Sequence, residues 1–97
     1  VSLAKAGIES ACRQLSLELA PYEVAVNAIQ AGVTNTAALQ KIPGNDDMVQ
    51  NAIKNNPHKR LTKPQDIADF IEILISYESS WMTGNIIRID GGEDITG

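Results

Sequence analysis

Lys5, near the beginning of the sequence, is the first side chain whose type and position could do chemistry. It lies in VSLAKAGIES, which has the apolar spacing of an amphipathic helix. A lysine there is either a solvated surface charge, which is the usual state of this residue, or one half of a catalytic pair. We favour the catalytic interpretation, with the other half of the pair outside this sequence.

Two threonines form the second candidate site. Thr34 and Thr36 follow the β-branched run EVAVNAI, and ligands of open α/β sheets bind beyond the carboxyl ends of the strands. Gly32 precedes them and lets the chain pass close to a bound group, because it has no side chain. The alternative is a loop whose threonines serve turn formation alone.

Other polar residues are weaker candidates. His58 follows Pro57 in a polar stretch and is expected to be solvated, so we do not assign it as a catalytic base. Cys12 is expected to pack. Four acids lack the order and spacing of a calcium loop, so no metal is predicted. These acids are Asp46, Asp47, Glu93 and Asp94.

Composition excludes several classes of partner. The 97 residues are 43% hydrophobic and 21% charged, as in an ordinary soluble globular protein, and their net charge is −4. Acids and bases are interspersed, which gives no basic surface for nucleic acid or an anionic membrane. No apolar run is long enough to span a membrane. The single cysteine excludes a disulfide framework or a zinc cluster and favours a reducing, cytoplasmic setting.

Hydrophobic periodicity and turn residues predict the elements that must position the candidate residues. In order, they are a helix to about Ala20, a strand over 23–29 buried on both faces, a short helix within 43–56, a helix within 62–80 and a strand over 85–90. Pro21 ends the first helix, and Gly91 and Gly92 form the turn after the last strand.

Each predicted helix has an expected buried face or cap. The stripe of the first helix is Ala4, Ile8, Ala11, Leu15 and Leu19. The short helix is expected to be capped by Asn45 or Asp46 and to bury Met48, Ala52 and Ile53. The third helix has Thr62 and Gln65 at capping-box spacing, and its expected buried residues are Ile67, Phe70, Ile71 and Leu74.

This order predicts an α/β fold with two parallel strands joined by a long helical crossover. Parallel strands this apolar need further strands and helices on both faces, which two strands cannot supply. We therefore expect the chain to be the C-terminal fragment of a larger Rossmann-type, doubly wound parallel sheet. The first residue, Val1, lies inside a helical pattern, which also predicts that the protein begins further upstream.

Four stretches in this order resemble the C-terminal part of a short-chain dehydrogenase/reductase. They are AKAGIES, VAVNAIQAGVTNT, RLTKPQDIADFIEILIS and MTGNIIRIDGG. The resemblance implies that residues 1–97 are the C-terminal part of one Rossmann-type domain whose N-terminal nucleotide-binding half is absent. It also implies NADPH or NADH as cofactor. The 97 residues alone are not expected to catalyse a reaction.

In that family a tyrosine donates a proton to the substrate, and a lysine on the same helix holds the nicotinamide ribose and lowers the tyrosine's pKa. The resemblance assigns the lysine role to Lys5. The usual tyrosine position, four residues earlier, is occupied by Val1. Tyr22 and Tyr77 have no lysine at either family spacing and are expected to pack.

The chain resembles most closely the enoyl-acyl-carrier-protein reductases, in which the tyrosine lies seven residues before the lysine. Here that position lies three residues before Val1. Both spacings place the two side chains on one helix face. LAKAGIESACRQLSLELA, and Ala31–Gly32 where the wider family usually has proline and glycine, also resemble this branch.

The resemblance implies further contacts. The backbone at Thr34 is expected to meet the nicotinamide carboxamide and the Thr36 hydroxyl the pyrophosphate. The long segment after Thr36 is expected to cover the substrate, with Ala37, Ala38 and Leu39 near an acyl chain carried by acyl carrier protein or a related enoyl or carbonyl compound. The resemblance further implies a homodimer or homotetramer, with Trp81 and Met82 packing against another subunit.

Three functions remain open. The first is NAD(P)H-dependent reduction of 2-enoyl-acyl-carrier-protein in fatty acid biosynthesis. The second is 3-oxoacyl-acyl-carrier-protein reduction or another short-chain alcohol dehydrogenase activity. The third is a non-catalytic relative in which Val1 truly replaces the tyrosine.

Overall fold

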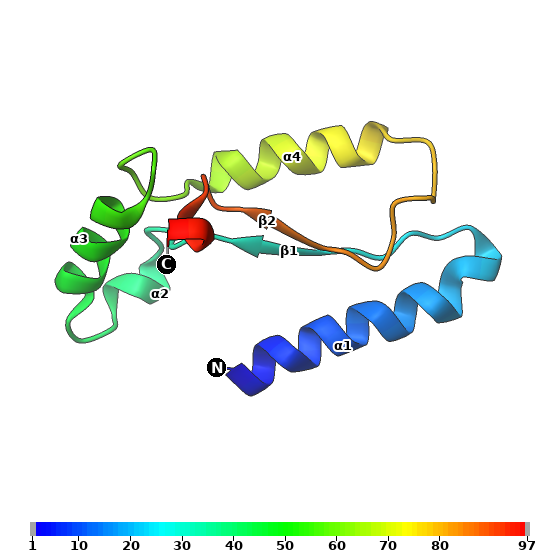
Figure 1. The fold of residues 1–97 in the computed structure, drawn as a ribbon, viewed down its shortest axis with the longest axis horizontal. Helices are drawn as coiled ribbons and strands as arrows, with labels where there is room; N and C mark the ends of the chain where they lie inside the picture. The colour runs from blue at the N-terminus through cyan, green and yellow to red at the C-terminus, as the bar shows by residue number, and fades with distance from the viewer. Residues whose placement is uncertain (1, 97) are drawn as a thin grey trace. The chain divides into compact units, whose positions relative to one another are not determined.

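The computed structural model describes residues 2–96, so Val1, at the usual tyrosine position, lies outside the described residues. The chain forms four α-helices, two short 3₁₀ helices and two strands within that range (Figure 1). In order they are α1 (Ser2–Leu19), η1 (Ala20–Tyr22), β1 (Ala28–Ala31), α2 (Ala37–Gln40), α3 (Asn45–Asn55), α4 (Pro64–Ser76), β2 (Ile86–Ile89) and η2 (Glu93–Thr96). No helix in the described range is long and apolar enough to cross a membrane.

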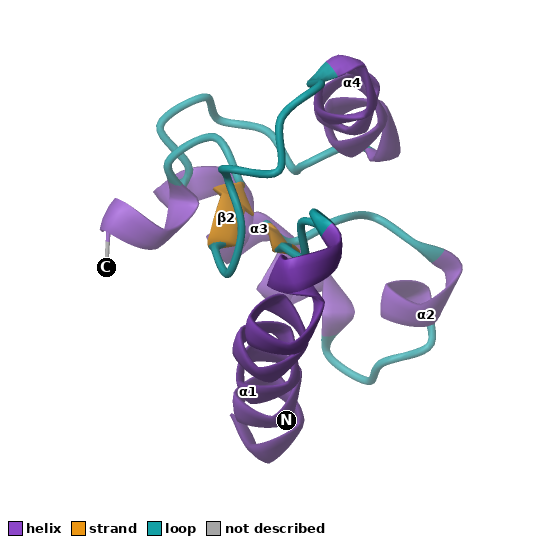
Figure 2. Ribbon diagram, turned by 90° about the vertical axis from the view of Figure 1, so that its right-hand side faces the viewer, coloured by secondary structure: helices purple, strands orange, loops and turns teal. Residues whose placement is uncertain are grey.

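The chain divides into two compact units, and each strand runs from the first into the second. The first unit comprises residues 2–30 and 76–87, and the second comprises residues 31–75 and 88–96. β1 and β2 form a two-stranded sheet, and Figure 2 shows strand residues in orange. The amide N of Ala28 donates to Asn85 O at 2.9 Å and that of Gly32 donates to Ile89 O at 3.3 Å, which is parallel register.

The predicted α/β class with a parallel sheet is confirmed, but the first strand begins later than predicted. Residues 24–27 lie outside β1, and side chains take part in the pairing there. The Thr83 hydroxyl accepts from Val26 N at 2.9 Å, and Asn27 Oδ1 accepts from Asn85 N at 3.1 Å. The prediction of burial on both faces is wrong for this chain, since β1 is half-buried and its last residue is exposed.

In the first unit, helix α1 forms as predicted, but a different face is buried. Ile8 (62% exposed) and Leu15 (43%) of the predicted stripe are exposed, whereas Cys12 (5%) and Ser16 (8%) are buried one turn apart. Cys12 Sγ lies 3.5 Å from Val26 O, which confirms that it packs. The Ser16 hydroxyl donates to Arg13 O at 2.7 Å, and a side chain at Gly84 would meet this hydroxyl. Small residues therefore line the face that approaches the strands.

In the second unit, both predicted helix caps are wrong. Gly44, in the left-handed region with φ +77°, precedes α3, and neither Asn45 nor Asp46 caps it. At the start of α4, the carboxylate of Asp66 accepts from Lys63 N at 2.8 Å, while the Gln65 amide instead donates to Asp69. Asp66, the third residue of α4, therefore makes one of the two hydrogen bonds of a capping box, the one from its side chain to the backbone N–H that precedes the helix.

The predicted inner faces of α3 and α4 are only partly correct. Met48 on α3 is exposed, whereas Ala52 and Ile53 are half-buried as its inner side. Of the predicted face of α4, Ile67, Phe70 and Leu74 are half-buried, and Ile71 is exposed. The predicted last strand is confirmed by β2, and Gly91 and Gly92 form its turn with φ +65° and +87°.

Candidate functional site

The candidate site centres on the loop that follows β1, residues 32–36. Gly32 begins it and is packed between two buried residues of other segments, Thr62 and Asp90. A Cβ atom at Gly32 would lie 2.5 Å from Thr62 Oγ1 and 3.0 Å from Asp90 Cβ. The sequence predicted this glycine for close passage of a ligand, but the structure shows a requirement set by the protein's own packing.

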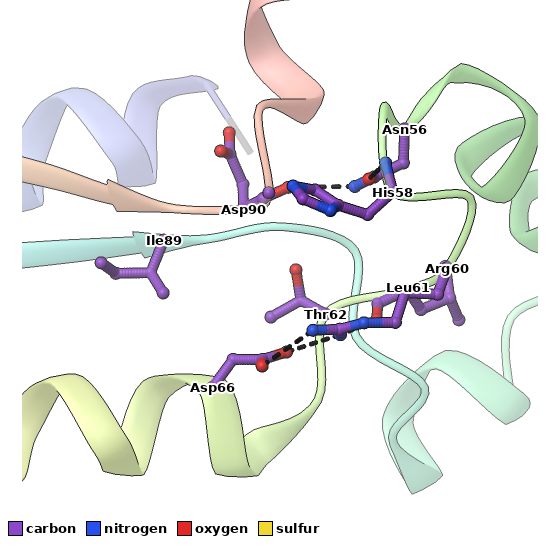
Figure 3. A pocket seen from close by; sticks show the side chains of 9 residues that line it. Asn56, His58, Arg60, Leu61, Thr62, Asp66, Ile89 and Asp90 are labelled. Atoms are coloured by element: carbon purple, nitrogen blue, oxygen red, sulfur yellow. Dashed lines mark hydrogen bonds and ion pairs between the residues drawn. The ribbon is translucent and has the colours of Figure 1, made fainter.

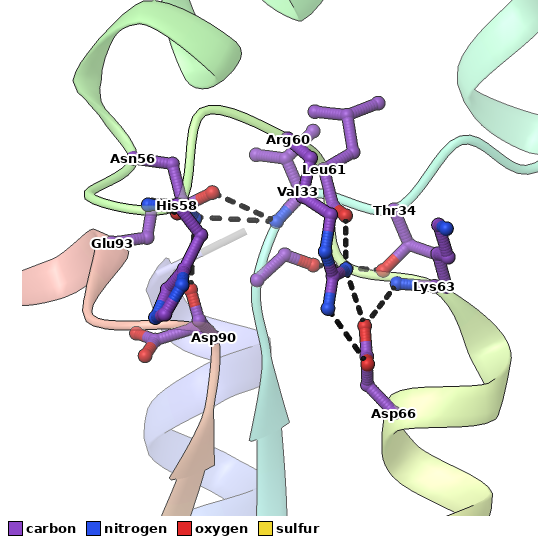
Figure 4. Close-up of polar contacts among 11 residues, drawn as sticks. Val33, Thr34, Asn56, His58, Arg60, Leu61, Lys63, Asp66, Asp90 and Glu93 are labelled. Atoms are coloured by element: carbon purple, nitrogen blue, oxygen red, sulfur yellow. Dashed lines mark hydrogen bonds and ion pairs between the residues drawn. The ribbon is translucent and has the colours of Figure 1, made fainter.

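Val33 is held through both of its backbone polar groups (Figure 4). Its N–H donates to the carboxylate of Glu93, with both oxygens 3.3 Å from the nitrogen. Its carbonyl accepts from Thr62 N at 3.0 Å, beside a parallel bridge between Thr34 and Thr62. The loop is therefore fixed by residues from before α4 and after β2.

The two predicted cofactor threonines play different local roles. The Thr34 hydroxyl donates to Gly32 O at 2.9 Å, and the backbone N–H and C=O of Thr34 have no hydrogen-bond partner among residues 2–96. The Thr36 hydroxyl caps α2 by accepting from Leu39 N at 3.2 Å. A hydroxyl that accepts in this way keeps its own proton for donation. The chain thus presents backbone groups at Thr34 and an exposed hydroxyl donor at Thr36.

Asp90 organises the turn after β2 and is buried. Its carboxylate accepts from the N–H groups of Gly92, at 2.9 Å, and Asp94, at 3.2 Å. The backbone carbonyl of Asp90 accepts from Asn56 Nδ2 at 3.0 Å. Asn56 is only 2% exposed, and its Oδ1 accepts from His58 N at 2.7 Å. These bonds connect the end of α3 to the turn that carries Glu93.

A cavity of about 250 Å³ lies beside this network (Figure 3). Its lining residues are Asn56, His58, Arg60, Leu61, Thr62, Asp66, Ile89, Asp90 and Gly91. The His58 side chain is exposed overall, as predicted, and its ring packs near Gly91. Every buried side-chain nitrogen or oxygen in the described part of the chain has a hydrogen-bond partner. The cavity therefore has no unpaired buried group aimed at a ligand.

The ion pair between Arg60 and Asp66 lines one side of the cavity (Figure 3), and Figure 4 shows its polar contacts. Arg60 donates to both carboxylate oxygens, at 2.7 and 3.0 Å. The hydrogen bond from Arg60, followed by that from Lys63 N, lowers the pKa of Asp66 to about 2. The same carboxylate thus begins α4 and positions the segment before it.

We expect Asp66→Asn to flatten the acid side of the protein's stability curve. The folded-state pKa lies below the unfolded value of about 4. The ionised Asp66 therefore stabilises fully above about pH 4, and this contribution is lost as the pH falls towards about 2. Denaturant unfolding between pH 2 and 5 measures the change, which should be small because the pair is solvent-accessible.

A titration of the Asp66 carboxyl carbon by NMR checks the cause directly. In Arg60→Met the largest contribution to the low pKa of Asp66 is removed, so its midpoint should rise. An Asp66 midpoint near 4 in the unaltered protein, or one that does not move in Arg60→Met, contradicts this account.

The other predicted site residues differ in exposure. Lys5 lies on α1 in the first unit with an exposed side chain and no hydrogen-bond partner among the described residues. Ala37 and Ala38 on α2 are exposed, whereas Leu39 is 7% exposed. The threonines and α2 belong to the second unit, and Lys5 belongs to the first.

The two tyrosines are more exposed than predicted. The expectation that Tyr22 and Tyr77 pack is wrong, because they are 75% and 49% exposed in this chain. Trp81 is 90% exposed, and Met82, whose carbonyl accepts from Asn27 Nδ2, is half-buried. Packing of Trp81 and Met82 against another subunit stays a prediction.

Sequence reasoning missed the residues that hold the loop. They are Asn56, Thr62, Asp90 and Glu93, each bonded to a residue far away in the sequence or packed against one. The aspartate directly before two glycines was a local sign of a side-chain-stabilised turn. No comparable local sign marks Asn56 or Glu93.

Comparison with known proteins gives matches over nearly all of the chain. A family model described as Enoyl-(Acyl carrier protein) reductase matches residues 1–94. Enoyl-[acyl-carrier-protein] reductase [NADH] FabI of Synechocystis is 36% identical over 97 residues, which are 100% of this chain and 38% of that protein. 3-Oxoacyl-[acyl-carrier-protein] reductase FabG of Thermotoga maritima is 36% identical over 88 residues, which are 91% of this chain and 35% of that protein.

A solved structure agrees in fold. The crystal structure of enoyl-[acyl-carrier-protein] reductase (NADH) from Aquifex aeolicus superimposes with a TM-score of 0.84 at 31% identity. The match covers 99% of this chain and 37% of the Aquifex chain. The chain therefore spans well under half the length of the proteins it matches, and its place as the C-terminal part of the domain stays a prediction.

Proposed function

Since this chain belongs to the short-chain dehydrogenase/reductase family, within the group described as enoyl-acyl-carrier-protein reductases, we propose that the intact protein is an NAD(P)H-dependent reductase of 2-enoyl-acyl-carrier-protein. The proposal includes a role in fatty acid biosynthesis and assembly as a homodimer or homotetramer. The match of the family model to residues 1–94 carries the proposal. A cytoplasmic setting belongs to the proposal and is supported by the single cysteine.

The donor chemistry of the candidate residues fits a nicotinamide dinucleotide. Ribose and pyrophosphate present oxygen acceptors, and the chain offers the Lys5 ammonium and the Thr36 hydroxyl, both exposed. A carboxamide needs one donor and one acceptor, and the backbone of Thr34 has both groups without partners in the described range. The support is thus chemical complementarity at the end of β1, where ligands of such sheets bind.

In this proposal the bound nicotinamide supplies the hydride for the substrate's double bond. Lys5 binds and orients the ribose hydroxyls, and its charge favours the ionised form of a tyrosine three residues before Val1. Thr36 donates to the pyrophosphate. Ala37 and Ala38, which are exposed, contact the acyl chain, whereas Leu39 is buried in this chain.

We expect the intact protein to oxidise NADH or NADPH faster with crotonyl than with acetoacetyl thioesters. If acetoacetyl thioester is the better substrate, the proposed 2-enoyl substrate is wrong. That result would support the second candidate function. That candidate, 3-oxoacyl-acyl-carrier-protein reduction, is favoured by the equal 36% identity to the Thermotoga relative. Cofactor binding without oxidation of either cofactor by any thioester identifies a non-catalytic relative.

A further inference from the structure

Glu93 holds the predicted cofactor loop from outside the loop. Its carboxylate reaches the Val33 N–H from 60 residues further along the chain, with both oxygens at 3.3 Å. Val33 separates Gly32, which is fixed by packing, from Thr34, whose backbone is assigned to the cofactor. A charged acceptor on a half-buried amide is stronger than a neutral one. The contact is therefore placed to set the backbone position of the residue next to Thr34.

The turn that carries Glu93 is itself tightly determined. Asp90 accepts from the N–H groups of Gly92 and Asp94 with its side chain and from Glu93 N with its carbonyl, at 3.2 Å. Gly91 and Gly92 both adopt positive φ, which orients the chain so that η2 begins at Glu93. The carboxylate is thus presented by a turn that these hydrogen bonds define.

We propose that Glu93 is a positioning residue for the nicotinamide cofactor, acting through Val33 on the loop that contains Thr34 and Thr36. The inference rests on the proposed function. Without the carboxylate, Val33 keeps only its bond from Thr62 N, so the loop occupies its binding-competent arrangement for a smaller fraction of the time. Apparent cofactor affinity falls in proportion to that fraction, and the chemical step does not change.

The test measures cofactor affinity of the intact protein by the fluorescence of bound NADH and NADPH. Glu93→Ala is expected to raise the dissociation constant about five- to tenfold, the scale set by losing one hydrogen bond as long as 3.3 Å, with kcat within about twofold. Glu93→Gln keeps one oxygen acceptor and should restore affinity to within about threefold of the unaltered protein. Tighter binding by Glu93→Gln would instead indicate simple charge repulsion and overturn the proposal.

Asp94→Ala is the matched control. It removes the same charge from the next residue of η2, where the Asp94 side chain pairs with Arg88 at the exposed surface rather than with Val33. Cofactor affinity should be unchanged. If Asp94→Ala weakens binding as much as Glu93→Ala, the effect belongs to the net charge or to the turn, and the assignment to Glu93 is wrong.

Amide hydrogen exchange at Val33 tests the contact without cofactor or turnover. Protection of Val33 should be lost in Glu93→Ala, reduced in Glu93→Gln and kept in Asp94→Ala. Unchanged protection of Val33 in either Glu93→Ala or Glu93→Gln overturns the inference. One stable variant is therefore enough for this test. If the unaltered protein binds neither NADH nor NADPH, the proposed function fails, and the positioning role fails with it however Val33 exchanges.

Discussion

Replacing Lys5 by methionine in the intact protein is expected to lower kcat by about 10²-fold or more, the scale of a group that assists proton transfer. Lys5 lies exposed on α1 without a partner among residues 2–96, so its removal breaks no contact that stabilises the described fold. A loss of turnover would therefore report on bound ligands and not on folding. Steady-state kinetics with saturating NADH or NADPH measure the change.

The pH dependence of kcat separates a catalytic role of Lys5 from a general effect of its charge. Loss of a cation raises the pKa of a neighbouring acid, so the apparent pKa that limits kcat in Lys5→Met should move upward. Lys5→Arg keeps the charge but changes the donor geometry and should recover part of the rate.

Arg13→Met supplies the matched control, because Arg13 is also an exposed cation on α1. It should leave kcat and the pH profile unchanged. Retention of kcat within about threefold in Lys5→Met, well short of the loss expected for an acid–base group, identifies Lys5 as an ordinary surface charge. An equal loss in Arg13→Met shows that the helix is sensitive to any loss of charge.

Gly32→Ala is expected to destabilise the protein by about 2 kcal/mol or more, the scale of overpacking a closed site. The new Cβ would lie 2.5 Å from Thr62 Oγ1 and 3.0 and 3.2 Å from two Asp90 atoms, one of which is backbone. Thr62 and Asp90 are both buried, so neither can withdraw freely. Thermal or denaturant unfolding measures the loss, and cofactor affinity should fall with it because Gly32 begins the loop.

A double-mutant cycle locates the cause. Thr62→Ala removes the nearest atom, so Gly32→Ala should cost less in that background than alone. Gly7→Ala is the control, because a Cβ at Gly7 meets no atom within 4 Å and alanine is favoured inside a helix. It should be neutral or stabilising. Additive effects of Gly32→Ala and Thr62→Ala would contradict the packing explanation.

Local features of the sequence predicted the elements well and their surroundings less well. α1, α4 and β2 were predicted because helical and strand periodicity is repeated within a few residues, and the turn at Gly91 and Gly92 has a local signal. Both helix caps were predicted wrongly, because neighbouring residues take these positions. Asp66, and not Gln65, turns back to the start of α4, because Arg60 and Lys63 N converge on its carboxylate.

The residues of the candidate site were likewise predicted only in part. Lys5, Thr34 and Thr36 were assigned from sequence, and their roles towards a cofactor stay predictions. The structure added the residues that hold the loop, including Glu93. Sequence reasoning had weighed Glu93 only as a calcium ligand and had rejected that role. It also gave a different reason for a glycine at position 32, since a side chain there would meet Thr62 and Asp90.

The sequence by itself determined the family, the order of helices and strands, and the residues with suitable chemistry, because these depend on residue type and short-range spacing. Only the tertiary structure decided which polar groups meet. Val33 and Glu93 are 60 residues apart, and Asn56 and Asp90 are 34 apart. A hydrogen bond between such residues has no period along the chain, so it exists only after the strands have paired and the turns have closed.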